Sequence, residues 1–461
     1  MAFLSEFSHN EETGKMGLRA RILSQMVGVR GFRTVETRWE TSGGQQVEPL
    51  GGVISADAVL VLVQKRRWAP RCSQCLAICR ADSCHQQLKP RRWSDLPCLE
   101  HPVVLEYAPI RVKCKRCGCH AVELIPWADP RQRQTRRLQQ HLALDAFSMP
   151  ISHVATKYGL SWHTVRRAEL SAIERWDRTC PPEPLRQIGV DEKWLGRRHK
   201  RSEKFVTIVS NLETGKPIWM GYGRGADTLT SWLATLTSED KAGIVLFAMD
   251  MYAPFRKAIR DDPALDHAAI VHDPFHIIKR AGEALSELRR QVFFRGGDEL
   301  RAVGRGTRWL VLKAWERTGE DDRTRLKKLF SFNGKLARAY QVVDELRVAL
   351  RAPDEVTMAD GIWHVLRRTS RRDNVPMRKL HDSLRAHMDG ILALGEHHPP
   401  TGRIEALNNN WEALVRRGRG YRNHRYLLAK LRFITANPVR NRKGILRFLA
   451  LGIPAPIPAA A

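Results

Sequence analysis

Two acidic residues stand where the sequence predicts the ends of neighbouring strands. Asp191 ends the run IGVD, and Asp250 ends the strongly hydrophobic run GIVLFAMD. Adjacent strands lie about 4.8 Å apart, so two carboxylates at such positions can share divalent cations. A two-metal site holds its ions about 3.5–4 Å apart and stabilises both the attacking and the leaving oxygen. Oxygen ligands suit Mg²⁺ or Mn²⁺. Taken singly, either aspartate could instead be a helix N-cap or a turn residue.

A third carboxylate is expected from a separate helix. The segment GRIEALNNNWEAL, residues 402–414, has helical character. Glu405 shares a face of that helix with Asn408 and Asn409, because residues three and four apart are neighbours. Glu412 is two turns further on and close to the same face, so it is the alternative to Glu405.

Cysteines are concentrated in one part of the chain. Eight of the nine lie between Cys72 and Cys119. The pairs Cys72/Cys75 and Cys114/Cys117 each have CxxC spacing, and two such pairs form a tetrahedral thiolate site for Zn²⁺. Because no export signal is evident, this clustering favours metal ligation over disulfide bonds. The metal is expected to stabilise the fold and not to take part in catalysis. Further candidate ligands are Cys79, Cys84, His85, Cys98, Cys119 and His120.

The charge of the chain points to a polyanionic partner. Lys and Arg number 77 against 49 Asp and Glu, giving a net charge of +28 with basic clusters spread along the chain. A long polyanion such as DNA is the natural partner for such a surface.

Residues 131–176 have helical periodicity and fit a helix-turn-helix. Ser161 can cap the third helix, whose inward face includes Val165 and Leu170. The predicted DNA contacts on the exposed side of that helix are His163, Thr164, Arg166 and Arg167. The segment could also be a three-helix packing unit without DNA, but the neighbouring arginines favour DNA contact.

A second basic segment, RRGRGYRNHRY, continues the helix that carries Glu405. It interleaves arginine with tyrosine, a pattern suited to phosphates and stacked bases. Its predicted DNA contacts are Arg416, Arg417, Arg419, Tyr421 and Arg422.

The fold class predicted from these elements is multidomain α+β. After a proline-rich linker, the order of elements is β-β-β-α-β-α-β-α, which indicates a mixed sheet. The predicted segments are an irregular extension (1–50), a small β-rich zinc module (51–128), the helix-turn-helix (129–180), a core (185–280), a helical region (281–400), the final acid helix with its basic segment (401–436) and a C-terminal tail (437–461).

Several of these motifs together resemble one family, the bacterial insertion-sequence DDE transposases of the ISL-three (ISL3) group. They are the CxxC pairs, GLSWHTVRR, IGVDE, AMDMYAPF, VHDPFHIIK and GRIEALNNN followed by RRGRGYRN. The resemblance implies an RNase H-like core interrupted by a helical insertion, with Asp191, Asp250 and Glu405 as the catalytic triad that binds Mg²⁺. It leaves the roles of Asp273, His276 and Lys279 open.

The function expected from the resemblance is DNA cleavage at the ends of an insertion sequence and strand transfer into target DNA. The partners would be terminal inverted repeats and target DNA, and the need to hold two ends is consistent with a homodimer. The alternatives are a non-catalytic DNA-binding regulator and an RNase H-like nuclease that cuts without joining. No membrane span or secretory leader is evident in the sequence, which predicts a cytoplasmic, nucleoid-associated protein.

Overall fold

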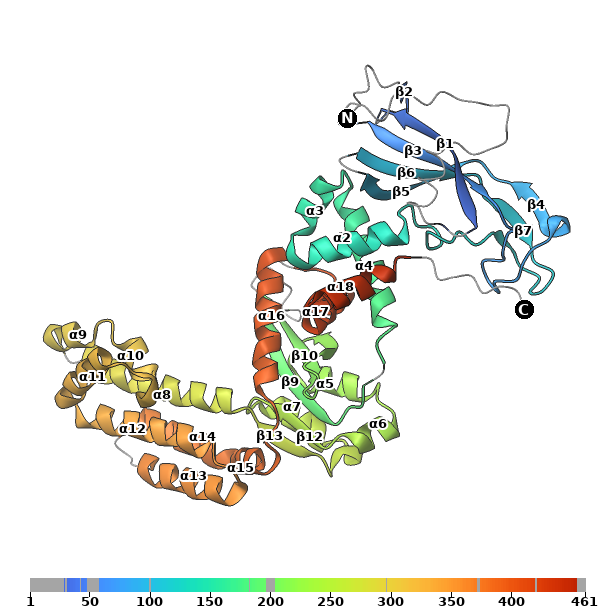
Figure 1. The fold of residues 1–461 in the computed structure, drawn as a ribbon. Coiled ribbons are helices and arrows are strands. Elements are labelled where there is room, and N and C mark those ends of the chain that lie inside the picture. Colours follow the sequence, from blue (N-terminus) through green and yellow to red (C-terminus); the bar gives the residue numbers. More distant parts are fainter. Residues whose placement is uncertain are drawn as a thin grey trace. The chain divides into compact units, whose positions relative to one another are not determined.

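The structure, a computed structural model, describes residue 29 and residues 31–41, 43–47, 58–98, 101–181, 183–195, 204–295, 297–370, 374–418 and 421–453 (Figure 1). The chain forms two compact units. The first comprises residues 1–181, 417–419 and 436–461, and the second comprises residues 182–416 and 420–435.

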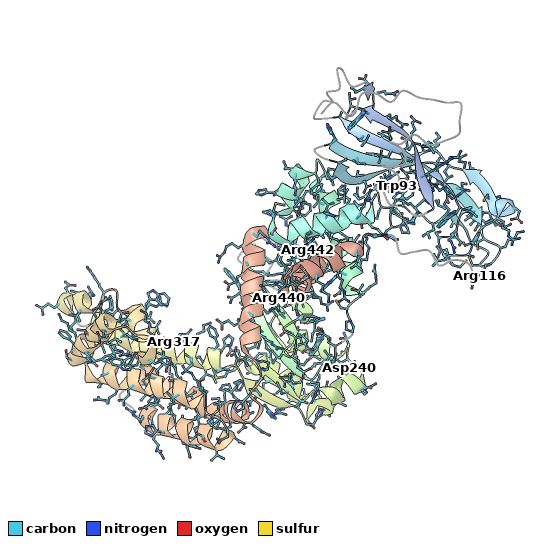
Figure 2. All side chains as sticks on the ribbon, in the orientation of Figure 1. Trp93, Arg116, Asp240, Arg317, Arg440 and Arg442 are labelled. Atoms are coloured by element: carbon cyan, nitrogen blue, oxygen red, sulfur yellow. The ribbon has the colours of Figure 1, made fainter. Side chains whose placement is uncertain are left out.

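A five-stranded sheet begins the first unit, with the order β2-β1-β3-β6-β5. Its strands are β1 (Phe32–Glu40), β2 (Gln46–Val47), β3 (Val59–Arg66), β5 (Arg91–Cys98) and β6 (His101–Tyr107). Its core contains Leu62, Leu105 and Trp93, which is labelled in Figure 2. Strands β1 and β2 lie where the sequence predicted irregular structure. The register of β1 shifts between Thr34 and Glu36, and this bulge interrupts the alternation that would have marked a strand.

A smaller sheet, with the order β4-β7-β8, carries the cysteines. Its strands are β4 (Cys84–Gln87), β7 (Ile110–Lys113) and β8 (His120–Val122). A short 3-10 helix, η1 (Ala81–Ser83), precedes β4. The sequence predicted one strand over residues 104–112, whereas the structure has two, β6 and β7, in different sheets. Pro109 lies between them, and a proline cannot donate to a continuous ladder.

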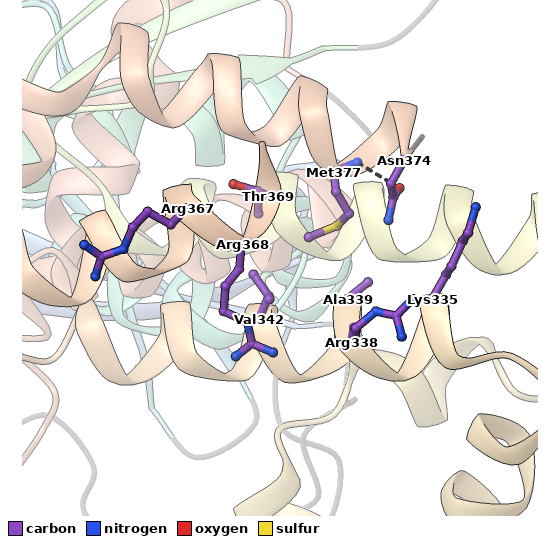
Figure 3. Close-up of a pocket in the computed structure, with 9 residues that line it drawn as sticks. All are labelled: Lys335, Arg338, Ala339, Val342, Arg367, Arg368, Thr369, Asn374 and Met377. Atoms are coloured by element: carbon purple, nitrogen blue, oxygen red, sulfur yellow. Dashed lines mark hydrogen bonds between the residues drawn. The ribbon is translucent and has the colours of Figure 1, made fainter. Parts of the chain in front are cut away.

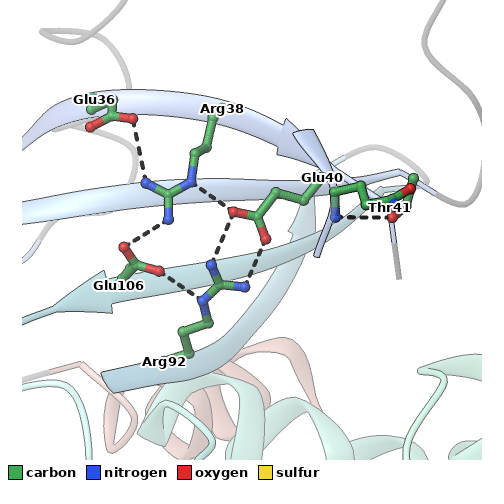
Figure 4. A network of polar contacts seen from close by, with 7 residues as sticks. Glu36, Arg38, Glu40, Thr41, Arg92 and Glu106 are labelled. Carbon is green, nitrogen blue, oxygen red and sulfur yellow. Dashed lines mark hydrogen bonds and ion pairs between the residues drawn. The ribbon is translucent and has the colours of Figure 1, made fainter. Parts of the chain in front are cut away.

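An ion-pair network joins strands β1, β5 and β6 (Figure 4). Arg38 Nε donates to Glu40 Oε1 at 2.7 Å, and Arg92 Nη1 donates to Glu40 Oε2 at 2.7 Å. Both arginines also donate to Glu106 at 2.7 Å. Glu40 is only 4% exposed, so its charge depends on these two arginines.

We expect Glu40→Gln to destabilise the first unit by about 1–3 kcal/mol at neutral pH, because a buried charge-assisted network loses its centre. Burial raises the pKa of Glu40, but the hydrogen bonds from Arg92 and Arg38 lower it below its ordinary value. A lowered folded-state pKa gives stability that is present above the unfolded pKa and is lost as pH falls through the folded pKa. Urea unfolding followed by tryptophan fluorescence should therefore show a large difference between wild type and Glu40→Gln at neutral pH and a smaller one in acid. Equal differences at both pH values would contradict this role.

Three helices follow the sheets: α2 (Arg136–Ser148), α3 (Ile151–Lys157) and α4 (Trp162–Asp177). Ser161 Oγ accepts from the backbone N–H of Thr164 at 3.2 Å, which confirms the predicted cap. Val165 is buried as predicted, and Leu170 is half-buried. Gly159, at φ +61°, makes the turn between α3 and α4.

Helix α18 (Arg442–Ala450) completes the first unit within the segment predicted as a tail. It packs on α2, where Gln140 Nε2 donates to the carbonyl of Phe448 at 2.7 Å. Residues 454–461 lie outside the described residues.

The second unit is built on a mixed sheet with the order β11-β10-β9-β12-β13, which confirms the predicted fold class. The strands are β9 (Gln187–Trp194), β10 (Phe205–Asn211), β11 (Pro217–Tyr222), β12 (Leu246–Met249) and β13 (Ala269–His272). Strands β9, β10 and β11 pair antiparallel, whereas β12 lies parallel to both β9 and β13. The connecting elements are α5 (Ala226–Leu233), α6 (Ser238–Gly243), α7 (Ala253–Arg260) and η3 (Pro263–Leu265).

A helical region separates β13 from the last two helices of this unit, α16 (Gly402–Gly418) and α17 (His424–Ala436). Its elements are α8 (Pro274–Phe294), α9 (Asp298–Gly304), α10 (Arg308–Leu312), η4 (Trp315–Arg317), α11 (Glu320–Phe332), α12 (Gly334–Ala349), α13 (Glu355–Thr369), α14 (Val375–Ala386) and α15 (Met388–His397). One core runs from Ala248 and Val271 of the sheet into this region. Within the described residues, no helix combines the length and the apolar character needed to cross a membrane.

Candidate active site and metal sites

The pairing of β9 with β12 brings two predicted acids together. Val190 pairs with Met249 in a parallel register, and each is followed directly by an aspartate, Asp191 and Asp250. The two carboxylates therefore extend from adjacent positions of neighbouring strands, about 4.8 Å apart along the hydrogen-bonding direction.

Both carboxylates leave the same face of the sheet. Val190 and Met249 belong to the core on one face, together with Ile188 and Phe247. Successive side chains of a strand alternate between faces, so Asp191 and Asp250 point to the opposite face. Helix α16 covers that face, where Leu407 and Trp411 pack against Ile208 of β10.

Each aspartate has one oxygen held by the backbone. The Oδ1 of Asp191 accepts from the N–H of Glu192 at 2.8 Å, and the Oδ1 of Asp250 accepts from the N–H of Met251 at 2.6 Å. The Oδ2 of Asp191 is buried and accepts no hydrogen bond, although Lys193 Nζ lies 3.1 Å away. Lys193 supplies the positive charge that offsets the burial of this oxygen, and a metal cation bound there would do the same.

Asp273 and His276 extend the acidic site from the start of α8. The Oδ1 of Asp273 accepts from the N–H of Phe275 at 3.0 Å, and its Oδ2 lies 3.4 Å from His276 Nδ1. Burial lowers the pKa of His276, but Asp273, Asp250 and Asp191 raise it above its ordinary value. His276 therefore lies near enough to these aspartates for their charges to act on it, a placement that the sequence left open.

Glu192 was not predicted as a functional residue. Burial raises its pKa, and the nearby charges of Asp191 and Asp250 raise it further. Arg224 Nη1 lies 3.9 Å from the Glu192 carboxylate, and its guanidinium lies 4.1 Å from the ring centre of Phe205. The only signal in the sequence is that Glu192 follows the first acid directly.

Glu405 lies in the first turn of α16. The neighbouring residue of that helix, Ile404, packs closely against Gly189 of β9. A Cβ on Gly189 would lie 3.2 Å from Ile404 Cγ1 and 2.7 Å from the side chains of Leu212 and Ser210, so a larger residue would push these groups apart. Ile404 is buried there, and the next side chain, Glu405, is exposed.

The structure does not bring Glu405 into a closed ligand set with the two aspartates. Among the residues that the structure describes, the only group of three or more Cys, His, Asp or Glu whose ligand atoms all lie within 4.8 Å is formed by cysteines. Glu412 is also exposed, and Asn408 is half-buried. The assignment of Glu405 over Glu412 stays a prediction.

The cysteine group consists of Cys72, Cys75, Cys114 and Cys117. The sulfur atoms of Cys72 and Cys117 are 3.7 Å apart, and those of Cys75 and Cys114 are 3.5 Å apart. Tetrahedral zinc with Zn–S bonds of about 2.3 Å separates its sulfur ligands by about 3.8 Å. The four cysteines predicted from the sequence as ligands therefore have sulfur–sulfur distances that fit a zinc ion.

Backbone N–H groups lower the pKa of the first cysteine of each pair, Cys72 and Cys114. Burial raises the pKa of Cys72, but the N–H groups of Cys75 and Gln74 lower it to about 6. The N–H of Cys117 likewise lowers the pKa of Cys114. Thiolates are the ligand form for zinc, so the first cysteine of each pair favours binding.

Cys119 is the nearest rival ligand. Its sulfur lies 3.2 Å from that of Cys72 and 3.3 Å from that of Cys117. Cys79 is buried and is not a member of that group of four. The rings of His85 and His120 stack at 5.0 Å on the same small sheet.

The predicted DNA contacts of α4 lie in its first turns. His163 and Arg167 are exposed, while Thr164 and Arg166 are half-buried. The Arg166 guanidinium lies 5.8 Å from the ring centre of Trp162. Arg167 and His163 are therefore the most accessible of the four.

The residues of the second basic segment differ in their exposure and in their contacts. Arg416 and Arg422 are exposed. Arg417 Nη1 donates to the carbonyl of Phe147 at 2.7 Å, a structural contact. The ring of Tyr421 lies 5.8 Å from that of Tyr426. Arg419 falls outside the described residues.

Known proteins resemble the chain over both of its DNA-related regions. A family model described as a transposase, of the DDE type and the ISL3 family, matches residues 188–431, and one described as the helix-turn-helix domain of transposase family ISL3 matches residues 123–171. The transposase for insertion sequence element IS1001 of Bordetella parapertussis is 26% identical over 90% of this chain and 98% of its own length. The transposase for insertion sequence element IS1557 of Mycobacterium tuberculosis is 25% identical over 74% of this chain and 80% of its own length.

Proposed function

Because this chain belongs to the ISL3 family of DDE-type DNA transposases, we propose that it cuts DNA at the ends of an insertion sequence and joins the freed strand to target DNA. The observation that carries this proposal is the parallel register of Val190 with Met249, which sets Asp191 and Asp250 side by side on one face of the sheet. The proposed partners are the terminal inverted repeats and the target DNA.

The residues of the site have distinct proposed roles. Asp191, Asp250 and Glu405 hold divalent metal ions, with Mg²⁺ or Mn²⁺ suited to such oxygen ligands. Bound metal ions supply the polarisation that activates the attacking oxygen and stabilises the leaving oxygen. His276, whose Nδ1 lies 3.4 Å from Asp273 Oδ2, helps to hold the acids in position.

The first unit is proposed to recognise the ends of the element. The zinc module fixes the small sheet, and the exposed His163 and Arg167 of α4 reach base edges and phosphates. A homodimer would bring two ends together for one reaction.

The proposal is tested with a duplex that carries the element's own end, taken from the DNA flanking its reading frame. Incubation with Mg²⁺ or Mn²⁺ and a supercoiled target should give nicks at the end of the element and covalently joined products, both absent without added metal. Nicking without joined products would identify a nuclease, and binding without nicking would identify a regulator. Either result would contradict the proposal.

A further inference from the structure

We propose that the helical region contributes its own DNA contact, a groove between α12, α13 and the start of α14 that binds backbone phosphates. The groove encloses a cavity of about 170 Å³ (Figure 3). Four cationic side chains line it, namely Lys335 and Arg338 from α12 and Arg367 and Arg368 from α13. We call these four residues with Asn374 the basic groove. The inference rests on the proposed action of the chain on DNA.

Two arginines of the basic groove lie apart from the carboxylates of the described residues. None of the described residues that line it is acidic. Arg368 pairs with Glu345, whereas Arg338 and Arg367 are exposed and, within the described residues, have no carboxylate within 4.0 Å. Arg338 and Arg367, exposed on two adjacent helices, contribute a positive potential that attracts a polyanion.

The remaining lining residues give the basic groove a fixed shape. Ala339, Val342, Thr369 and Met377 are buried and form its floor. The positive end of α14 opens into it, where Asn374 caps the helix by accepting from the N–H of Met377 at 3.4 Å. A helix N-terminus adds partial positive charge and favours a phosphate.

Duplex DNA fits this arrangement better than a small anion. Arg338 and Arg367 come from different helices, and Figure 3 shows their guanidinium groups well apart, with that of Arg367 directed away from the other labelled side chains. A single phosphate satisfies one such site, whereas a nucleic-acid strand presents a series of phosphates that can meet both. Because the same chain matches the helix-turn-helix domain of a transposase family, we infer that the nucleic acid is DNA.

The experiment compares two double variants of the full chain. Arg338→Gln with Arg367→Gln removes two charges from the basic groove. Lys327→Gln with Lys328→Gln, both exposed on α11, removes the same charge elsewhere in the helical region. Binding to a labelled DNA duplex of mixed sequence is measured over a series of salt concentrations without added Mg²⁺, so the result does not depend on strand cleavage.

We expect the arginine variant to lower the magnitude of the slope of log K against log salt by about 1.8, the value for two lost phosphate contacts. The lysine variant should keep the wild-type slope, and Arg338→Lys with Arg367→Lys should restore most of it. An unchanged slope in the glutamine variant, an equal loss in the lysine variant, or an effect seen only with an RNA duplex would each overturn the inference. A chain that passes this test but cuts no DNA would refute the proposed function alone.

Discussion

Asp250→Asn is expected to reduce metal-dependent cleavage of the element's end by at least about 1,000-fold while leaving DNA binding at the wild-type level. A metal ligand contributes several kcal/mol of transition-state stabilisation, and about 4 kcal/mol corresponds to three powers of ten in rate. The substitution keeps the shape of the side chain and the acceptor oxygen for the N–H of Met251. Folding and DNA affinity should therefore survive it.

The control for this variant is Asp261→Asn, a substitution of the same kind at an exposed aspartate just after α7. Single-turnover nicking and equilibrium DNA binding are measured for both variants. Asp261→Asn should behave as wild type. Cleavage by Asp250→Asn within tenfold of wild type would remove Asp250 from the metal site.

The same design decides between the two glutamates of α16. Glu405→Gln should lose cleavage as Asp250→Asn does, whereas Glu412→Gln should retain it. Both side chains are exposed, so neither substitution disturbs the core. The reverse result would assign the third ligand to Glu412.

The pairing of the two aspartates could be predicted from sequence because it depends on local signals. Each hydrophobic run leads into its acid, and the parallel pairing of β9 with β12 sets the two acids side by side. The predicted strand end at Asp191 was wrong, because β9 continues to Trp194. The approach of α16 could not be predicted in the same way, because the helical region of residues 274–397 separates it from the sheet. Gly189 was visible in IGVD, but nothing in the sequence shows that Ile404 packs beside it.

Other features depend on contacts between residues distant in the sequence. Glu40 meets Arg92 across 52 positions, so the buried network has no local pattern. Asp273 and His276 stood in a recognisable block, but the register of His272 with Met249, which places Asp273 beside Asp250, follows from the strand order. Composition and periodicity report which face is apolar, and they do not report which distant charges will meet.

Removing zinc is the second change for which we expect a large effect. The small sheet has a minimal apolar core: its buried cluster within the described residues consists of Cys72, Cys79, Cys114 and Val112. Three of these four side chains are cysteines, and two of them belong to the metal set. Without the ion, burial of Val112 together with the partly buried Ile110 and Ala77 cannot offset the entropy of ordering the surrounding loops.

Cys72→Ser, or chelation of the wild-type protein, should therefore unfold the small sheet and weaken binding to the element's end. Zinc binding supplies about 10 kcal/mol or more to domains that fold around the metal, which is comparable with the stability of a whole domain. Zinc content by atomic emission and the circular dichroism spectrum are measured together. We expect about one zinc per wild-type chain, as one tetrahedral site requires, and loss of strand signal when the ion is removed.

Two serine substitutions separate the ligand set from its neighbours. Cys180 lies outside the cysteine cluster, so Cys180→Ser should retain both the zinc ion and the folded structure. Cys119→Ser should also retain zinc if the four CxxC cysteines are the ligands, because its sulfur lies only beside those of Cys72 and Cys117. Loss of zinc in Cys119→Ser equal to that in Cys72→Ser would place Cys119 among the ligands. An unchanged spectrum in the zinc-free protein would show that the sheet folds through apolar burial alone, contrary to the argument from its small core.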